Sequence, residues 1–486
     1  MLKTKIVSYV VILIFLLTIF NVAGLKNNNE NEKNNHIILE NKPWTYKFYT
    51  DGAGEFPLTK PNWMDSSYLS IVKSLNSIIH PLKSSPLELN DADLDVLAYM
   101  GDCKIVGLGE ATHGTKEFFQ LKHRIFRYLV ENYGFKIFAF ECDMGESYYV
   151  NKFVTEGVGN LDNIMKNIMS FWTWRTEEVK NLLLWMREYN EHKSDGDKIY
   201  FIGVDCQDMT YQSDIIKNYF DKANISLPED CIQFLNEIKQ MGSNYSYYLQ
   251  SYYSNMTLDK KEEIDQNVDI LLSKFQDLKN ELLSVSSEFK YQFIKQIVLN
   301  IKQVNDVRYG YAHDILKNYR DMYMANNSLW TSALFGEDTK VALWAHNDHI
   351  AYYESNGSIG GSIGFYLKEE LKEKYQIIGF ACSLGRFTAM NRFNFLTIHN
   401  IKPKLGSINY VFHRARYDNF ILRESDIQTD SDFDKWISEP QLFLDIGSVF
   451  YDFIYPRFFY YHPTDLKEMY DVIIYWDVTK AAQQLN

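Results

Sequence analysis

One stretch of the chain, residues 104–143, constrains the fold more than any other. It opens with a short apolar run at 105–108 bounded by turn residues, which is typical of a strand buried on both faces. A polar turn follows, and apolar side chains then recur at helical spacing until Gly134, a residue type that commonly ends helices. A second apolar run at 136–140 leads into Glu141. The stretch therefore predicts two parallel strands joined by a right-handed helical crossover.

The same alternation continues along the chain and predicts an α/β fold: a mainly parallel sheet with helices on both faces and a helical insertion. Further strands are expected over 198–204, 340–344, 375–382 and 471–476. Residues 213–330 instead have a helical pattern with few glycines and many charges, and we interpret them as the insertion. The α/β domain would then comprise residues 90–212 and 331–486.

The N-terminal residues are typical of an export signal. Lys3 and Lys5 precede a charge-free apolar run at 6–24, and an Asn-rich polar segment follows. This pattern predicts a signal peptide over 1–24, and an uncleaved membrane anchor is the alternative. Residues 25–89 form an N-terminal extension. The protein is therefore expected to be exported (secreted, periplasmic or anchored), with a membrane as partner only if the segment stays uncleaved.

Composition excludes some partners. The formal net charge is −13, which argues against nucleic acid or an anionic membrane surface and is common in soluble proteins. There are five cysteines and no CxxC motif, so no disulfide framework is expected despite the predicted export.

Acidic and histidine residues follow the predicted strands closely, at the sheet edge where ligands bind in such folds. Glu110 and His113 follow the first strand, and a carboxylate beside a histidine can orient it as a general base. Glu141 follows the second strand, while His346 and His349 follow the fourth. The simpler interpretation is that these are polar residues of loops and first helical turns.

Other chemistries are less well supported. Two His and two Glu could bind zinc, but no HExxH motif is present and the ligands would come from separate loops, so neither metal nor cofactor is expected. Ser362 lies in a GxSxG pattern at 360–364, yet a flexible loop precedes it where a nucleophile elbow needs a strand. Trp172, Trp174 and Arg175 could line a pocket for a bulky ligand, or could simply be core residues and a surface ion pair.

Six motifs occur in order between residues 89 and 482: GLGEATHGTKEFFQLKHR, FAFECD, FWTWRTEEV, NYRDMYMANN, WAHNDHIA and YDVIIYWDVTKA. This ordered set resembles the erythromycin esterase family. The resemblance implies an α/β fold with a helical insertion, and hydrolysis of an ester, in the best-known members the macrolide lactone. It also implies a histidine general base with no required metal.

Carried over by position, the resemblance makes His113 the base, supported by Glu110, with Glu141 as the second acidic residue and His346 and His349 as the paired histidines. Lys122 stands where the family commonly has Arg; it keeps the charge but loses the bidentate fork, which bears on substrate orientation.

We therefore expect a hydrolase of a small-molecule ester or lactone, with the substrate itself left open. The alternatives are a metal-dependent hydrolase using the same residues, or a non-catalytic protein that holds a metal or cofactor at this edge. The predicted export departs from the cytosolic macrolide-resistance enzymes of the family.

Overall fold

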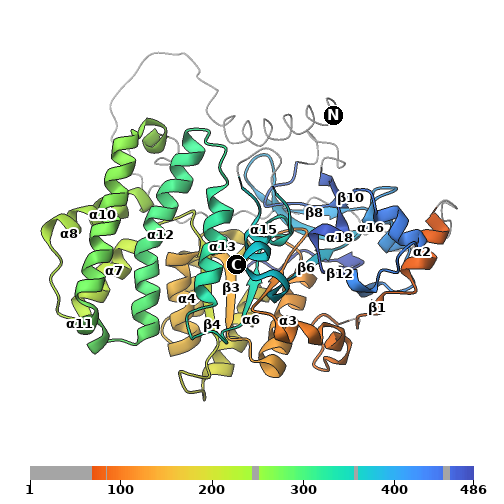
Figure 1. Cartoon of the computed structure of the whole chain (residues 1–486), viewed down its shortest axis with the longest axis horizontal. Helices are drawn as coiled ribbons and strands as arrows, with labels where there is room; N and C mark the ends of the chain where they lie inside the picture. Colours follow the sequence, from red (N-terminus) through yellow and green to blue (C-terminus); the bar gives the residue numbers. More distant parts are fainter. Residues whose placement is uncertain (1–67, 84, 244–250, 355–359, 452–459, 486) are drawn as a thin grey trace, which may run out of the picture. The chain divides into compact units, whose positions relative to one another are not determined.

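An eight-stranded sheet organises the chain, with strand order β1-β9-β12-β6-β2-β5-β3-β4 (Figure 1). The computed structural model describes residues 68–83, 85–243, 251–354, 360–451 and 460–485, so the predicted signal segment 1–24 and most of the extension 25–89 lie outside the described residues. The strands are β1 (His80–Pro81), β2 (Ile105–Leu108), β3 (Ile137–Asp143), β4 (Tyr200–Asp205), β5 (Val341–Trp344), β6 (Tyr375–Ala381), β9 (Asn419–Arg423) and β12 (Val472–Trp476).

The predicted parallel sheet is confirmed. Neighbouring strands are parallel all the way from β12 to β4, whereas β9 pairs antiparallel with β12 and β1 antiparallel with β9. All residues of β2, β3, β4 and β5 are buried, because helices cover both faces of a parallel sheet. The strands β2 and β3 are parallel, as predicted, but β5 lies between them and pairs with both. A strand from much later in the chain thus separates the two strands of the first unit.

Side chains of the strands alternate between two hydrophobic cores, one on each face of the sheet. Ile105 belongs to the core that contains the helices after β4, whereas Val106 belongs to the core beneath α3 and α6. The helices α3 (Lys116–Tyr133), α4 (Met144–Glu156) and α6 (Glu177–Asn190) come from the first half of the chain. As predicted, α3 ends at Gly134, which adopts a φ of 70° that residues with a Cβ rarely tolerate.

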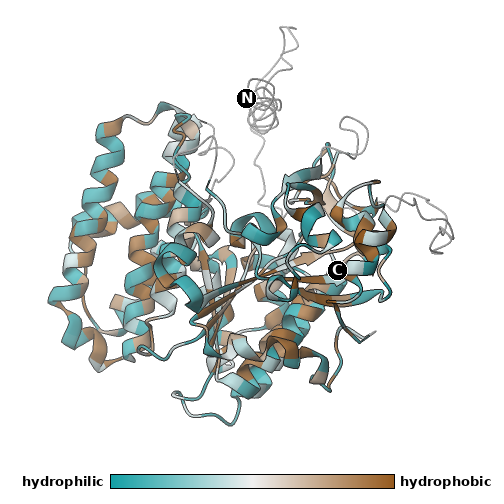
Figure 2. Ribbon diagram, turned by 45° about the vertical axis from the view of Figure 1, so that its right-hand side comes forward, coloured by the Kyte–Doolittle hydropathy of each residue, from teal (hydrophilic) through white to brown (hydrophobic). Residues whose placement is uncertain are grey.

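The helical segment after β4 forms its own group beside the sheet, drawn in green in Figure 1. Its helices are α7 (Gln212–Lys222), α8 (Glu229–Ser243), α10 (Leu258–Asp277), α11 (Lys279–Ser284), α12 (Glu288–Ala312) and α13 (Tyr319–Thr331). They alternate hydrophobic and hydrophilic colouring along their length (Figure 2), as amphipathic helices do. The last of them, α13, returns to pack against β4 and so brings its N-terminal residues to the carboxyl end of the sheet.

Two smaller sheets were not predicted from the sequence. The strands β7 (Leu384–Met390), β8 (Leu396–Ile401) and β13 (Val478–Thr479) form one, and β10 (Gln441–Leu444) pairs with β11 (Tyr461–Thr464) in the other. Short helices connect the strands: α2 (Leu69–Leu75), α5 (Leu161–Asn163), α14 (Asn347–Ile350), α15 (Ile363–Leu371), α16 (Ile408–His413), α17 (Asp432–Ile437) and α18 (Leu466–Met469). The segment η2 (Ala92–Asp102) is a longer 3₁₀ helix. Shorter helical segments of 3₁₀ or π type are η3 (Ile164–Ile168), η4 (Trp172–Trp174), η6 (Tyr253–Asn255), η7 (Lys372–Lys374) and η8 (Glu424–Asp426).

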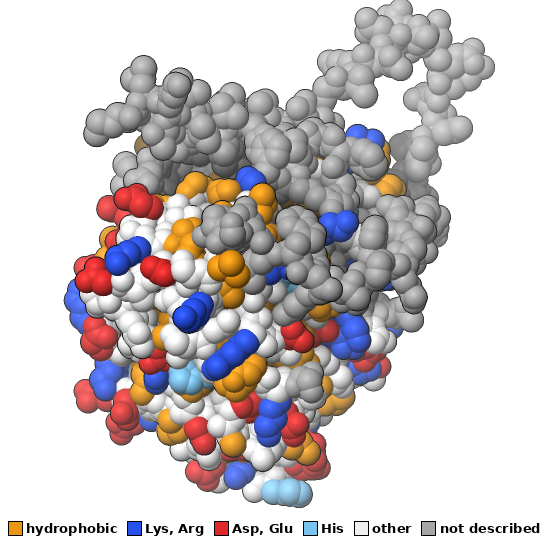
Figure 3. Space-filling model, turned by 90° about the vertical axis from the view of Figure 1, so that its right-hand side faces the viewer, with side chains coloured by type: hydrophobic (Ala, Val, Ile, Leu, Met, Phe, Trp, Pro, Cys, Tyr) orange, Lys and Arg blue, Asp and Glu red, His pale blue; other side chains and the backbone are white. Residues whose placement is uncertain are grey.

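All five cysteines are buried and free, which agrees with the expectation of no disulfide framework. Within the described ranges, no helix has the length and apolar character needed to cross a membrane. Acidic and basic side chains are interspersed on the face shown in Figure 3, so the net negative charge is not gathered into one patch there.

Candidate active site

The loop after β2 carries the first predicted pair, Glu110 and His113. Neighbouring backbone fixes this loop: the carbonyl of Gly114 accepts hydrogen bonds from the amides of Thr388 (3.0 Å) and Ala482 (2.9 Å). A Cβ on Gly114 would lie 2.0 Å from the carbonyl oxygen of Thr388, so the close approach requires glycine. The three-stranded sheet β13-β7-β8 and the C-terminal segment therefore hold this loop in place.

Glu110 is completely buried and receives three hydrogen bonds. His113 Nδ1 lies 2.7 Å from Oε1, while Lys122 Nζ (2.6 Å) and Trp344 Nε1 (2.8 Å) donate to Oε2. Burial alone would raise the pKa of Glu110, but the Lys122 ammonium and the bond from His113 hold it below its usual value. Glu110 is thus a carboxylate at neutral pH, with both oxygens occupied.

His113 is oriented by that carboxylate. Because Nδ1–H donates to Glu110, the lone pair of the neutral imidazole is on Nε2. Burial lowers the pKa of His113, and the bond to Glu110 opposes that effect only in part. The ring packs edge-on against Phe171, with 5.4 Å between centroids, and lies 4.7 Å from the ring of His346. A neutral histidine held in one orientation meets the requirements for a general base.

Glu141 occupies the centre of a second network at the end of β3. Its Oε2 accepts a hydrogen bond from the backbone amide of His346 (2.9 Å), and Arg320 donates to its Oε1 (2.8 Å). His349 Nε2 lies 3.3 Å from the same Oε1. Burial alone would raise the pKa of Glu141, but His349 and Arg320 hold it well below its usual range. Glu141 therefore joins β3 to the loop after β5.

Positive charge gathers around Glu141. Arg320 also makes two hydrogen bonds to Asp205, at 2.9 and 2.6 Å. His349 Nδ1 lies 2.7 Å from Asp321, although that contact is an ion pair without hydrogen-bond alignment. Burial alone would lower the pKa of His349, but Asp321 and Glu141 raise it well above its usual value. The neighbouring carboxylates thus favour the protonated form of His349, and Arg320 Nη1 also lies 3.0 Å from His349 Nε2.

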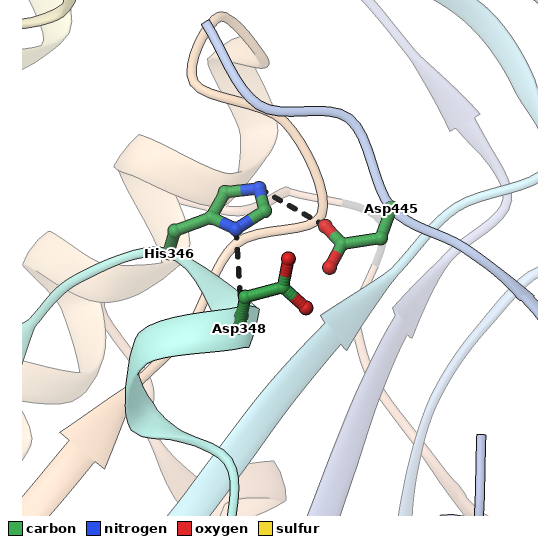
Figure 4. Close-up of side chains that lie close together, drawn as sticks. All are labelled: His346, Asp348 and Asp445. Atoms are coloured by element: carbon green, nitrogen blue, oxygen red, sulfur yellow. Dashed lines mark hydrogen bonds and ion pairs between the residues drawn. The ribbon is translucent and has the colours of Figure 1, made fainter. Parts of the chain in front are cut away.

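His346 begins the short helix α14. Its Nδ1 accepts a long hydrogen bond from the Asp348 amide (3.4 Å), and its Nε2–H donates to the carbonyl of Ile446 (3.1 Å). The same Nε2 lies 3.0 Å from Asp445 Oδ1, as Figure 4 shows. The side chain of Asn347 exchanges two hydrogen bonds with the backbone of Phe380 in β6, which fixes α14 against the sheet.

Two carboxyl groups lie together beside His346. Asp348 is in the first turn of α14, and Asp445 directly follows β10. The residue Asp348 as a whole is exposed to solvent. Desolvation of its carboxyl group and the nearby Asp445 carboxyl group nevertheless raise its pKa to about 8. Burial raises the pKa of Asp445 to about 7. Asp348, Asp445 and His346 thus form a carboxyl-rich corner next to His113.

Of the residues expected to contact substrate, Lys122, Trp172 and Trp174 are buried, whereas Arg175 is partly exposed. Lys122 is fully enclosed behind Glu110, with its ammonium 4.2 Å from the Trp344 ring centroid, a position that fits support of Glu110 better than contact with a ligand. Trp172 and Trp174 are also buried, and Arg175 donates to the carbonyls of Met169 and Ser170. Phe171, which was not predicted, is the aromatic residue that contacts His113.

Five further residues at this edge were not given a role from the sequence: Asp205, Arg320, Asp321, Asp348 and Asp445. Arg320 and Asp321 lie in the motif NYRDMYMANN, and Asp205 directly follows the strand predicted over 198–204. The sequence therefore contained a signal for these three residues. Asp445 follows a strand of the second small sheet, which the sequence did not predict. Asp477, which directly follows β12, does not join this group and instead contacts His413 Nδ1 (2.7 Å).

Ser362 offers a direct test of the serine-nucleophile alternative. It is fully buried and caps α15: its Oγ accepts a bond from the Phe365 amide and donates to the carbonyl of Ala351. Ser362→Ala is therefore expected to keep most ester turnover while lowering the free energy of unfolding by about 0.5–2 kcal/mol through loss of the cap. Steady-state kinetics and denaturant unfolding measure the two effects. Labelling of Ser362 by a fluorophosphonate probe would contradict the assignment.

Fold and site together define a class: an α/β protein with a buried Glu–His pair at the carboxyl edge of a parallel sheet. A model of the family described as erythromycin esterase matches residues 130–479 of the 486. The chain therefore belongs to the erythromycin esterase family. The match begins after the Glu110–His113 loop, so the family model does not include that loop.

Individual relatives agree with this assignment. Erythromycin esterase type II from Escherichia coli is 27% identical over 370 residues, covering 70% of this chain and 82% of the relative. The putative hydrolase YbfO from Bacillus subtilis (strain 168) is 25% identical over 346 residues, covering 62% and 71% respectively. Among solved structures, one described as a succinoglycan biosynthesis protein superposes with a TM-score of 0.72 at 26% identity, covering 87% of this chain and all of that one. Membership of this family and the similarity to these relatives show that the chain is a hydrolase of the erythromycin esterase family.

Proposed function

We propose that this hydrolase cleaves a small-molecule carboxylic ester or lactone, and that His113 is its general base. The observation that carries the proposal is the buried contact of 2.7 Å between His113 Nδ1 and Glu110 Oε1, which leaves Nε2 as a basic nitrogen. Glu110 in turn is held as a carboxylate by Lys122. Such a positioned base typically contributes on the order of 10²–10⁴-fold in rate.

In the proposed reaction, His113 Nε2 takes a proton from water as the water oxygen attacks the carbonyl carbon of the ester. The negative charge that develops on the carbonyl oxygen needs a nearby positive group, and His349 and Arg320 are the cations at this edge. When the tetrahedral intermediate breaks, the protonated His113 returns its proton to the leaving alkoxide. The products are a carboxylic acid and an alcohol, and the base is regenerated.

A macrolide lactone is the first substrate to test, because relatives of this chain are named as erythromycin esterases. Antibiotic resistance would follow only from macrolide turnover. We also propose export, on the charge-free run at 6–24 after Lys3 and Lys5, which would place hydrolysis outside the cytoplasm. A small molecule is then the expected partner, and nucleic acid is not.

The experiment is a panel of 14- and 16-membered macrolides, aliphatic lactones and simple esters, with products identified by mass spectrometry. The proposal is supported if the wild-type protein opens a lactone to a product heavier by about 18 Da, one water, and the His113→Ala protein does not. Absence of hydrolysis across the panel, by protein whose fold is verified by circular dichroism, would contradict it.

A further inference from the structure

The corner made by His346, Asp348 and Asp445 places three metal-ligating side chains around one point. One ligand atom from each residue lies within 4.8 Å of the others. Figure 4 shows the imidazole and both carboxylates directed toward a common space, from α14 on one side and the segment after β10 on the other. Separate elements, each anchored to a sheet, thus present the three groups together.

Two carboxyl groups lie side by side at this corner, and no lysine or arginine in the described ranges forms an ion pair with either of them. The basic groups that act on them are histidines: His346 contacts Asp445 at 3.0 Å, and the charges of His349 and His462 act on Asp445 and Asp348. Two like charges this close need a proton or a cation between them. By contrast, Glu110 and Glu141, two other carboxylates of the site, have Lys122 and Arg320 as partners.

One atom of the corner is also left without a hydrogen bond. Asp445 is about nine-tenths buried, and its Oδ1 receives no hydrogen bond from any described residue, although it faces His346 Nε2 at 3.0 Å. A buried carboxylate oxygen usually has a donor or a cation to bind, since leaving it bare is costly. The carbonyl of Ile446, 3.1 Å from the same nitrogen, adds a further oxygen beside it.

We propose that His346, Asp348 and Asp445 bind one divalent transition-metal ion, of the Zn²⁺ or Mn²⁺ class. One imidazole nitrogen with two carboxylates suits these ions, and three protein ligands leave a position open for water or substrate. The imidazole would bind through Nε2, the nitrogen that faces Asp445, and would give up the long contact between Nδ1 and the Asp348 amide. Glu110, His113 and Glu141 do not form such a set, so this site shares His346 with the earlier metal alternative but takes its carboxylates from Asp348 and Asp445.

The location gives the ion a role at the site. The rings of His346 and His113 are 4.7 Å apart, so the ion would lie close to the proposed base. Insofar as the proposed ester hydrolysis holds, the ion would add positive charge near the carbonyl oxygen of the substrate. Binding of the ion itself does not depend on that reaction.

The test measures binding in the absence of substrate, so its result is independent of ester turnover. Full-length protein is stripped with chelator and titrated separately with Zn²⁺ and Mn²⁺, by calorimetry and, for Mn²⁺, by electron paramagnetic resonance. We expect one equivalent of one or both ions, with affinity lowered by more than about tenfold in both Asp348→Asn and Asp445→Asn. Asp214→Asn, which removes an exposed carboxylate of the insertion paired with Lys239, is the matched control and should bind as the wild type does.

Two outcomes would overturn the proposal. In the first, folded wild-type protein binds neither Zn²⁺ nor Mn²⁺ at one equivalent. That is the result if the two carboxyl groups share a proton instead. The other is equal affinity in the wild type and both Asn variants, which would place the ion elsewhere. Thermal unfolding of each variant verifies that it is folded before it is titrated.

Discussion

Replacing His113 with Ala is expected to lower kcat by about 10²–10⁴-fold, with little change in the fold. The variant loses the Nε2 lone pair that would take the proton from water. Glu110 is not left unpaired, because Lys122 and Trp344 still donate to its other oxygen, so the buried network should survive. The measurement is kcat on the best substrate of the panel, together with the melting temperature of the variant.

The control for this prediction is His192→Ala, a change at an exposed histidine in the turn after α6, which should leave kcat unaltered. Glu110→Gln should also lower kcat, because a neutral amide stabilises the imidazolium less well than a carboxylate does. The double variant His113→Ala with Glu110→Gln should be no worse than His113→Ala alone, since the two residues act as a unit. Losses that multiply in the double variant would show that Glu110 has a separate role.

The pair Glu110 and His113 could be predicted because everything that places it is local. Both residues follow an apolar run, three positions apart in one loop, and the helix that starts shortly after them has a clear period. His346 and His349 were found in the same way, after β5. In each case a change of hydrophobic period marks the strand end, and the sheet then brings the strand ends together.

The partners of these residues depend on strand order, which local periodicity does not contain. Arg320 reaches Glu141 and Asp205 because α13 packs across β4 after more than a hundred residues of insertion. Asp445 approaches His346 because β10 belongs to a small sheet whose strands are short and only partly buried. Such strands lack the continuous apolar runs that made β2 and β3 recognisable.

The role of Lys122 shows what burial adds to a motif. By position in the motif it was expected to orient a substrate, and an arginine would have done so through a bidentate fork. In the structure neither Lys122 nor Glu110 has any exposed surface, and their contact of 2.6 Å lies inside the protein. Burial lowers the pKa of Lys122 to about 8 while Glu110 opposes that effect. The lysine is therefore a support for the carboxylate that orients His113.

Lys122→Met is accordingly expected to lower the free energy of unfolding by about 3–5 kcal/mol, because it leaves Glu110 buried without its ammonium partner. It should also lower kcat, since the pKa of Glu110 then rises and a neutral carboxyl group no longer orients His113. Lys122→Arg keeps the positive charge, so it should lower the free energy of unfolding and kcat less than Lys122→Met does. Denaturant unfolding at neutral pH and kcat on one ester measure the two effects.

The matched control is Lys198→Met, which breaks an ion pair with the exposed Asp195 and should cost no more than about 1 kcal/mol. The double variant Lys122→Met with Glu110→Gln separates the charge from the packing. If the cost of Lys122→Met comes from the uncompensated carboxylate, removing that carboxylate should recover part of the lost stability. Additive losses in the double variant would mean that the lysine stabilises the fold through its contact with Trp344 alone, and the chain of support from Lys122 through Glu110 to His113 would then be wrong.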